Sequence, residues 1–239
     1  MLTLYFCPTP NCQKVTIMLK AINAAFDTHK IDILAGDQNE PDFVAICPNK
    51  KVPVLVDPDF TGLDGKPLAI WESGAILIHL AEKSGQYLSA DPAIRAETLK
   101  WVMWQMSYLG PMMGQLHHFV MYAPEEVPYA IDRYMSEVHR LRALLNDTLE
   151  TRAFIAGDEM SIADFAIYPW VKLFGMRYEP DRPLPHMEAW FTRMEEYAFV
   201  TEGLFHQVDT IRPEVVGNAP ITDEHRSALF ASYQAKRQD

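Results

Sequence analysis

The sequence has 239 residues, enough for one large domain or two modest ones with a hydrophobic core. Apolar residues make up 49% and charged residues 22% of the chain, a composition typical of folded globular proteins and not of disordered ones. The formal net charge of −11 argues against a nucleic-acid-binding surface, because such surfaces need clustered Lys and Arg.

The N-terminus, MLTLYFCP, lacks a positively charged region and has too short an apolar run for a signal peptide. No segment approaches the roughly 18 consecutive apolar residues of a membrane span. The three cysteines are a low and odd number, which suits a reducing compartment where thiols stay free. We therefore expect a cytoplasmic protein that binds neither nucleic acid nor membrane.

The first ninety residues predict short strands that alternate with short helices. Residue patterns predict strands over residues 2–6, 29–33, 51–57 and 67–72, and helices over residues 11–22, 41–46 and 73–83. The early strand–helix–strand order predicts a right-handed parallel crossover, and the short turn at residues 62–66 predicts an antiparallel hairpin. This mixture is typical of an α/β domain of the thioredoxin type, which we place over residues 1–88.

From about Arg95 onward the sequence shows only helical patterns. Ser161 is the expected N-cap of one helix, with Asp164 at its N3 position. We expect an all-helical domain with a C-terminal tail over residues 95–239, and the last forty residues show no motif that we recognise. The predicted helices cover residues 97–113, 128–150, 161–173 and 185–197.

Four stretches of the chain resemble the glutathione transferases. Three are "NKKVPVLVD", "WESGAILIHLAEK" and "MSIADFAIYPWV", and the fourth, "TPNCQKVTI", resembles the Nu class and its fungal Ure2-like relatives. The likeness extends to about residue 200. It implies the glutathione transferase fold, with an α/β thioredoxin-like N-terminal domain and an all-α C-terminal domain. It also implies a homodimer that uses glutathione as co-substrate, with two molecules per site in the Nu-like relatives and no metal.

The resemblance implies that Glu72 and Ser73 bind the γ-glutamyl part of glutathione. Ser73 begins a predicted helix, whose first amide groups lack internal partners and carry partial positive charge. A carboxylate placed there is stabilised, and Glu72 would pair with the ammonium group of the same ligand. Without the resemblance, the pair is a helix-capping Ser that follows a surface Glu.

The resemblance also implies a cis peptide bond between Val52 and Pro53. The backbone N–H and C=O of Val52 would then pair with the cysteinyl unit of glutathione, as one strand pairs with another. The alternative is a trans proline that opens an edge strand. Lys51 and Gln38 would reach the glycyl carboxylate, although both also fit a solvated surface.

Thr9 and Asn11 are the expected catalytic residues. The resemblance places their donor groups beside the glutathione thiol, and such donors lower a thiol pKa from its usual value of about 8.5. The simpler interpretation is a turn with an N-cap. Arg133 is the expected contact for a glutathione carboxylate, and the alternative is an ion pair with Glu137 one helical turn away.

Cys12 leaves two interpretations open. Thr9 to Cys12 has the spacing of the glutaredoxin C-x-x-C motif, with Thr9 in place of the attacking cysteine, whereas the Nu-like pattern has glycine after the asparagine. Cys12 is either a small buried residue packed at the helix start or a thiolate that exchanges with bound glutathione disulfide. Metal binding has no support, because no histidines accompany the thiols in the arrangement that zinc sites require.

The resemblance predicts a glutathione-dependent disulfide-bond oxidoreductase. The thiolate of bound glutathione would reduce a small disulfide, and a second glutathione would resolve the mixed disulfide. The alternatives are a transferase that conjugates glutathione to hydrophobic electrophiles, and a non-catalytic glutathione-binding regulatory module. The "TPN" stretch lacks the tyrosine or serine of the conjugating classes, and the intact glutathione motifs argue against the third alternative.

Overall fold

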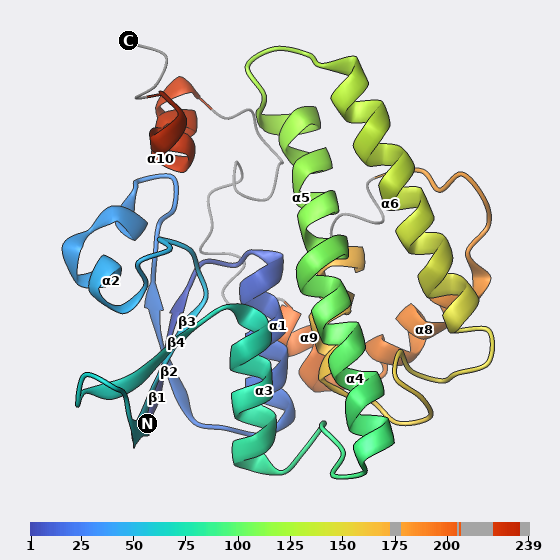
Figure 1. Ribbon diagram of the computed structural model, residues 1–239, viewed down its shortest axis with the longest axis horizontal. Coiled ribbons are helices and arrows are strands. Elements are labelled where there is room, and N and C mark those ends of the chain that lie inside the picture. Colours follow the sequence, from blue (N-terminus) through green and yellow to red (C-terminus); the bar gives the residue numbers. More distant parts are fainter. Residues whose placement is uncertain (173–177, 205, 207–221, 235–239) are drawn as a thin grey trace.

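A computed structural model describes residues 1–172, 178–204, 206 and 222–234. Its N-terminal half is a four-stranded sheet flanked by helices, and the rest of the described chain is helical (Figure 1). This arrangement agrees with the α/β N-terminal domain and the all-α C-terminal domain that the resemblance implies. The sheet contains β1 (Leu2–Phe6), β2 (Phe26–Lys30), β3 (Val54–Thr61) and β4 (Pro67–Trp71) in the order β2-β1-β3-β4.

Strand pairing in the sheet confirms the predicted mixed topology. β1 and β2 are parallel, and β3 is antiparallel to both β1 and β4. β2 begins three residues earlier than predicted, because Phe26–Lys30 pairs in register with the whole of β1. Ile31 has left the strand and packs in a small apolar cluster with Phe43, Cys47 and Val54. β3 starts only after Pro53 and runs on to Thr61.

Helices cover both faces of the sheet. α1 (Pro10–Ala21) and α3 (Ser73–Ser84) lie on the face toward the helical half, and α2 (Pro41–Ile46) lies on the other face (Figure 1). The short helix η1 (Asp37–Asn39) precedes α2. Apolar side chains from both halves of the chain belong to one hydrophobic core, so the helical half packs directly against α1 and α3.

The helical half departs from the prediction in one long run. The sequence predicts one helix over 97–113, whereas helical turns run without a break over residues 92–122 and include two π-helical stretches. The run consists of α4 (Pro92–Trp104), the π-helix η2 (Gln105–Leu109), α5 (Gly110–His117) and the π-helix η3 (His118–Tyr122). Asp91 caps its start by accepting hydrogen bonds from Ala93 and Ile94.

The later helices agree more closely with the sequence. Ser161 and Asp164 form the predicted capping box, with the Asp164 carboxylate accepting from the Ser161 N–H at 2.9 Å. The predicted end of that helix, residue 173, lies outside the described residues. The helices are α6 (Pro128–Thr148), α7 (Ile162–Trp170), α8 (Pro185–Glu195), α9 (Ala198–Leu204) and α10 (Asp223–Gln234), and the last two are not predicted.

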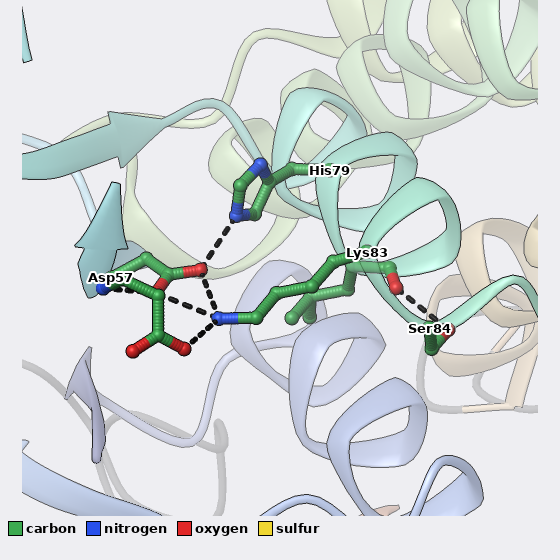
Figure 2. A network of polar contacts seen from close by, with 6 residues as sticks. Asp57, His79, Lys83 and Ser84 are labelled. Carbon is green, nitrogen blue, oxygen red and sulfur yellow. Dashed lines mark hydrogen bonds and ion pairs between the residues drawn. The ribbon is translucent and has the colours of Figure 1, made fainter. Parts of the chain in front are cut away.

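A buried carboxylate fixes α3 against the sheet (Figure 2). Asp57 on β3 is fully buried, and its carboxylate accepts from His79 Nε2 at 2.8 Å and from Lys83 Nζ at 2.7 Å. Burial alone would raise the pKa of Asp57, but hydrogen bonds from Lys83 and His79 lower it. Since both partners lie on α3, the network holds the helix whose first residue is Ser73.

None of the helices in the described parts of the chain combines the length and apolarity that a bilayer crossing demands.

Candidate functional site

A pocket opens where three connections of the N-terminal half meet. These are the β1–α1 turn, the segment before β3, and the β4–α3 turn. The first turns of α1 and α3 therefore border the same space, and the free amide groups of helix N-termini favour a negatively charged ligand there. The pocket is lined by Asn11, Cys47, Asn49, Lys51, Val52, Pro53, Trp71, Glu72 and Ser73.

Six of the nine residues predicted to be catalytic or to bind glutathione line this pocket. They come from three segments that lie far apart in the sequence, so the tertiary fold brings them together. The six are Asn11, Lys51, Val52, Pro53, Glu72 and Ser73, whereas Thr9, Gln38 and Arg133 are not among the lining residues.

The Val52–Pro53 peptide bond is cis, as the resemblance implies. Lys51 is exposed, Val52 is half-buried and Pro53 is buried. The Lys51 carbonyl lies 3.3 Å from Cys47 Sγ, a contact that ties this segment to the end of α2. Lys51 thus lines the pocket with an exposed side chain, while its backbone carbonyl contacts the Cys47 thiol.

Glu72 and Ser73 are neighbours in the pocket lining but differ in their exposure to solvent. Glu72 is exposed and has a φ of 75°, a conformation that residues with a Cβ seldom adopt. Ser73 is only 4% exposed, and its Oγ lies 3.7 Å from Met106 Sδ. The pair therefore presents a solvated carboxylate next to a buried hydroxyl at the N-terminus of α3.

Asn11 is oriented by a residue from the helical half. Trp170 Nε1 on α7 donates a hydrogen bond to Asn11 Oδ1 at 2.8 Å. An indole N–H can only donate, so the partner atom must be the amide oxygen, and the Asn11 NH2 group remains as a donor. Trp170 is a site residue that the sequence analysis missed, because 159 positions separate it from Asn11 and no local pattern links them.

Thr9 occupies the N-cap position of α1 but its side chain does not cap the helix. Its carbonyl accepts from the Gln13 N–H at 3.0 Å, and the Thr9 side chain is half-buried. The Thr9 side chain therefore interacts with Cys12 and does not cap the helix, so the simpler interpretation of a side-chain N-cap does not apply to Thr9.

Gln38 and Arg133 lie away from the pocket lining. Gln38 is 7% exposed, and its Nε2 donates to the carbonyl oxygens of Ile33 and Ala228, both at 3.2 Å. Ala228 belongs to α10, so the C-terminal helix packs over this side chain, and Figure 1 shows α10 near α2. Arg133 on α6 has a 60% exposed side chain and lies 3.8 Å from Glu137, the helical pair that its alternative interpretation describes.

All three cysteines are buried and free of disulfides. Burial raises the pKa of Cys7 to about 12 and that of Cys12 to about 11, although hydrogen bonds from the Cys7 and Thr9 backbone and the Thr9 side chain partly lower the pKa of Cys12. A thiol with such a pKa stays protonated near pH 7, and the thiolate is the nucleophilic form. This environment favours the packing interpretation of Cys12 over the redox one.

Within the ranges that the structure describes, no group of three or more His, Cys, Asp or Glu side chains is placed to hold a metal ion. The donors around the pocket are amides, a hydroxyl and one ammonium group, a set that suits carboxylates.

Two family models match the chain. The model described as "Glutathione S-transferase, N-terminal domain" matches residues 1–82, and the one described as "Glutathione S-transferase, C-terminal domain" matches residues 109–197. The first match includes the whole pocket.

Two relatives from Escherichia coli strain K12 are similar to this chain. "Disulfide-bond oxidoreductase YfcG" is 43% identical over 194 residues, which are 81% of this chain and 90% of YfcG. "Disulfide-bond oxidoreductase YghU" is 42% identical over 175 residues, which are 71% of this chain and 59% of YghU. The aligned region thus spans less than two thirds of YghU.

Two solved structures share the fold at similar sequence identity. A glutathione transferase from Pseudomonas putida with one glutathione disulfide bound per subunit is 40% identical with a TM-score of 0.76, covering 85% of this chain and 90% of that one. A glutathione transferase from Burkholderia graminis with two glutathione molecules bound per subunit is 40% identical with a TM-score of 0.79, covering 86% and 88% of the two chains.

Proposed function

This chain belongs to the glutathione S-transferase family, and from that premise we propose that it is a glutathione-dependent disulfide-bond oxidoreductase of the Nu class. One observation carries the proposal: the pocket has donors for an anionic peptide, but every cysteine of the chain is buried. A thiol for disulfide reduction must therefore come from a bound ligand. The relatives named as disulfide-bond oxidoreductases, and the neighbours with glutathione or its disulfide bound, support glutathione as that ligand.

We place the ligand along the pocket in the following way. The γ-glutamyl carboxylate lies at Ser73 and the N-terminus of α3, and Glu72 pairs with the ligand's ammonium group. The cysteinyl unit pairs with the backbone of Val52, and Lys51 binds the glycyl carboxylate. Gln38 and Arg133 remain predicted contacts for glutathione carboxylates, and each must give up or share the partner it has here.

The reaction that we propose runs in two exchanges. The glutathione thiolate, stabilised by donors from Thr9 and Asn11, attacks one sulfur of the substrate disulfide, and the other sulfur leaves as a thiolate that takes a proton from water. A second glutathione thiolate then attacks the glutathione sulfur of the mixed disulfide. The second substrate thiol leaves, and glutathione disulfide is the oxidised product. Two glutathione molecules thus supply the two electrons.

The first test compares two activities with reduced glutathione. We expect fast reduction of 2-hydroxyethyl disulfide and slow conjugation of 1-chloro-2,4-dinitrobenzene. Asn11→Ala should lower the disulfide-reduction rate by about 10–100-fold, because it removes a donor from the developing thiolate. Cys12→Ser should retain most of the activity. Strong conjugation with negligible disulfide reduction would instead identify a conjugating transferase, and binding without either reaction would identify a non-catalytic module.

We also propose a homodimer in the cytoplasm. Several large apolar side chains remain exposed on the single chain, and three buried free cysteines suit a reducing compartment. Fractionation of cells that express the protein from its own gene would contradict the location if the protein were found outside the cytosolic fraction.

A further inference from the structure

Beneath the pocket lies a buried amine that has no role in the reaction as proposed. Lys14 on α1 is 1% exposed, and its Nζ lies 2.6 Å from Gln105 Oε1 and 3.3 Å from Ser73 Oγ. Lysine side chains are seldom buried this deeply unless they are paired. The ammonium group is thus placed directly behind the hydroxyl that faces the pocket at the N-terminus of α3.

The hydrogen-bond partners of Lys14 fix the position of its Nζ but carry no negative charge. Among the described residues, no carboxylate forms an ion pair with its Nζ, and the nearer partner, Gln105, offers an uncharged amide oxygen. Trp170 contributes a ring face 6.0 Å away. Burial lowers the pKa of Lys14 well below its usual value, and the more distant Glu72 and Cys12 raise it only in part. A negative charge arriving close to Lys14 would offset this desolvation.

Gln105 contacts Lys14 from the start of a π-helical stretch. Gln105 is fully buried and is the first residue of η2, the π-helical stretch between α4 and α5. Such interruptions of an α-helix occur frequently at functional sites. Met106, the next residue, places its Sδ 3.7 Å from Ser73 Oγ and 4.0 Å from Lys14 Nζ. The helical half thus packs around the amine and the hydroxyl together.

The contact with Lys14 determines which way the Ser73 hydroxyl donates. When a bound carboxylate keeps Lys14 in its ammonium form, that group has three donors and no acceptor, so Ser73 Oγ accepts from Lys14 and its own proton must point elsewhere. The remaining neighbour, Met106 Sδ, is only a weak acceptor. Ser73 lines the pocket, so a carboxylate bound there is the strongest acceptor for that proton.

We propose that Lys14 is a positioning residue for glutathione: it orients the Ser73 hydroxyl toward the γ-glutamyl carboxylate and supplies the buried countercharge for that carboxylate. The inference rests on the proposed function, which places this carboxylate at Ser73. Lys14 is buried and contacts the Ser73 hydroxyl, so it acts on the ligand through Ser73 and through its charge. It therefore governs recognition of one end of the ligand and not the chemistry at the sulfur.

The test uses Lys14→Met, which keeps the length of the side chain and removes its charge. Binding is measured by calorimetry with S-methylglutathione, which has no ionisable thiol, and with its analogue in which 4-aminobutanoate replaces the γ-glutamyl unit and thus removes only the carboxylate. We expect the variant to bind S-methylglutathione about tenfold more weakly, equivalent to about 1.4 kcal/mol. Its affinity for the 4-aminobutanoyl analogue should stay within about twofold of the wild-type value.

Two further measurements separate positioning from a merely structural role. Lys14→Met relieves the burial of a charge but leaves the buried Gln105 amide oxygen without its donor, so the two effects should offset and the melting temperature should stay close to that of the wild type. In a Ser73→Ala background, Lys14→Met should weaken S-methylglutathione binding less than in the wild type, because part of its effect passes through Ser73. This second cycle decides the question if the analogue binds too weakly to measure.

The outcomes distinguish this inference from the proposed function. Equal losses for both ligands, or no loss in Lys14→Met while the wild type binds S-methylglutathione, would overturn the role of Lys14 alone. A wild-type protein that does not bind S-methylglutathione would overturn the proposed function and this inference with it.

Discussion

The donors of the site are oriented at the residue scale by hydrogen bonds from buried neighbours, one on α1 and one on α7. Trp170 fixes the amide of Asn11 by donating to its oxygen, and Lys14 lies behind the hydroxyl of Ser73. In both cases a group that can only donate occupies the acceptor of the site residue, so the proton-bearing side of that residue is left for the ligand. Preorganised donors of this kind are effective because they need no rearrangement when charge develops on the ligand.

Trp170→Phe tests this orientation of Asn11. The substitution keeps an aromatic ring but removes the N–H, so the Asn11 amide can rotate and present its oxygen to the thiolate. We expect kcat for disulfide reduction to fall about 3–10-fold, the equivalent of one neutral hydrogen bond. Steady-state rates with saturating glutathione measure the effect.

Trp101→Phe is the matched control for that experiment. Trp101 is similarly buried and its Nε1 donates to Glu97 Oε1 at 3.0 Å, away from the pocket. It should lower stability slightly and leave kcat unchanged. Equal losses of kcat in both variants would show that the effect reflects general packing.

At the scale of elements, the site depends on how α1 and α3 are held. α3 is fixed to the sheet by the Asp57 network, and α1 packs between the sheet and the helical half (Figures 1 and 2). α9 approaches α1 so closely that Thr16 Oγ1 donates to the Gly203 carbonyl at 2.7 Å and Gln13 Nε2 donates to the Leu204 carbonyl at 2.8 Å. The helix that carries Asn11 and Lys14 is thus held by these hydrogen bonds to α9, a contact called the α1–α9 clamp below.

Gly203→Ala should loosen the α1–α9 clamp. A Cβ at residue 203 would lie 2.5 Å from Ile17 Cα and 2.6 Å from Ile17 N, so the two helix backbones would have to separate. We expect a loss of about 2–4 kcal/mol in the free energy of unfolding, measured by urea denaturation. Gly114→Ala is the control, because its Cβ would make an ordinary contact of 3.4 Å with Trp170, and it should be neutral or slightly stabilising.

Glu97 on α4 makes a second link whose strength depends on pH. Its carboxylate accepts from Arg152 Nη1 at 2.7 Å and from Lys100 Nζ at 2.6 Å. Partial burial raises the pKa of Glu97, but hydrogen bonds from Lys100, Arg152 and Trp101 outweigh it and bring the pKa to about 2. The native pKa is below the unfolded one, so this stabilisation is present above about pH 4.5 and is lost as the pH falls toward 2.

Glu97→Gln should therefore destabilise the protein mainly near neutral pH. The side chain is 25% exposed, so we expect a loss of about 1–2 kcal/mol in the free energy of unfolding at pH 7. The difference from the wild type should shrink as the pH falls from 4.5 to 3. Urea denaturation at pH 7 and pH 3 measures both values, and a difference that does not change with pH would contradict the assignment.

At the scale of the whole molecule, the single chain leaves apolar surface in contact with solvent. The exposed side chains come from both halves, including β3, β4 and the run from α4 through η2. They include Phe60, Trp71, Ile94, Met103 and Tyr108. Scattered exposed apolar residues are ordinary, but this number of large ones, two of them within the β3–β4 hairpin, is consistent with a partner surface.

Size-exclusion chromatography with light scattering tests the proposed homodimer. We expect twice the chain mass of 27.3 kDa at micromolar concentration. Replacing exposed Phe60 and Met103 with Ser should shift the protein toward monomer without lowering the melting temperature of the single chain. A wild-type protein that elutes as a monomer at all concentrations would contradict the proposal.

The order of the elements was predictable from sequence because it depends on local patterns. Residues 2–6 form the first strand and residues 41–46 form α2, as their apolar spacing indicates. The capping box at Ser161 also needs only residues within one helical turn. The boundaries of β2 were shifted, since a strand ends where its partner ends, and that partner is set by the sheet.

The resemblance identified residues that the fold then brought to one pocket, as with Asn11, Pro53 and Ser73. The sequence, read with the family resemblance, determined the fold class, the order of strands and α-helices in the N-terminal half and most of the predicted residues at the pocket. Only the tertiary structure decided how those residues are oriented, which neighbours bury Lys14 and Cys12, and that α10 covers Gln38. The reason is physical: periodicity reports the neighbours within a few residues. A hydrogen bond between residues 91 or 159 positions apart in the sequence depends on how whole helices pack.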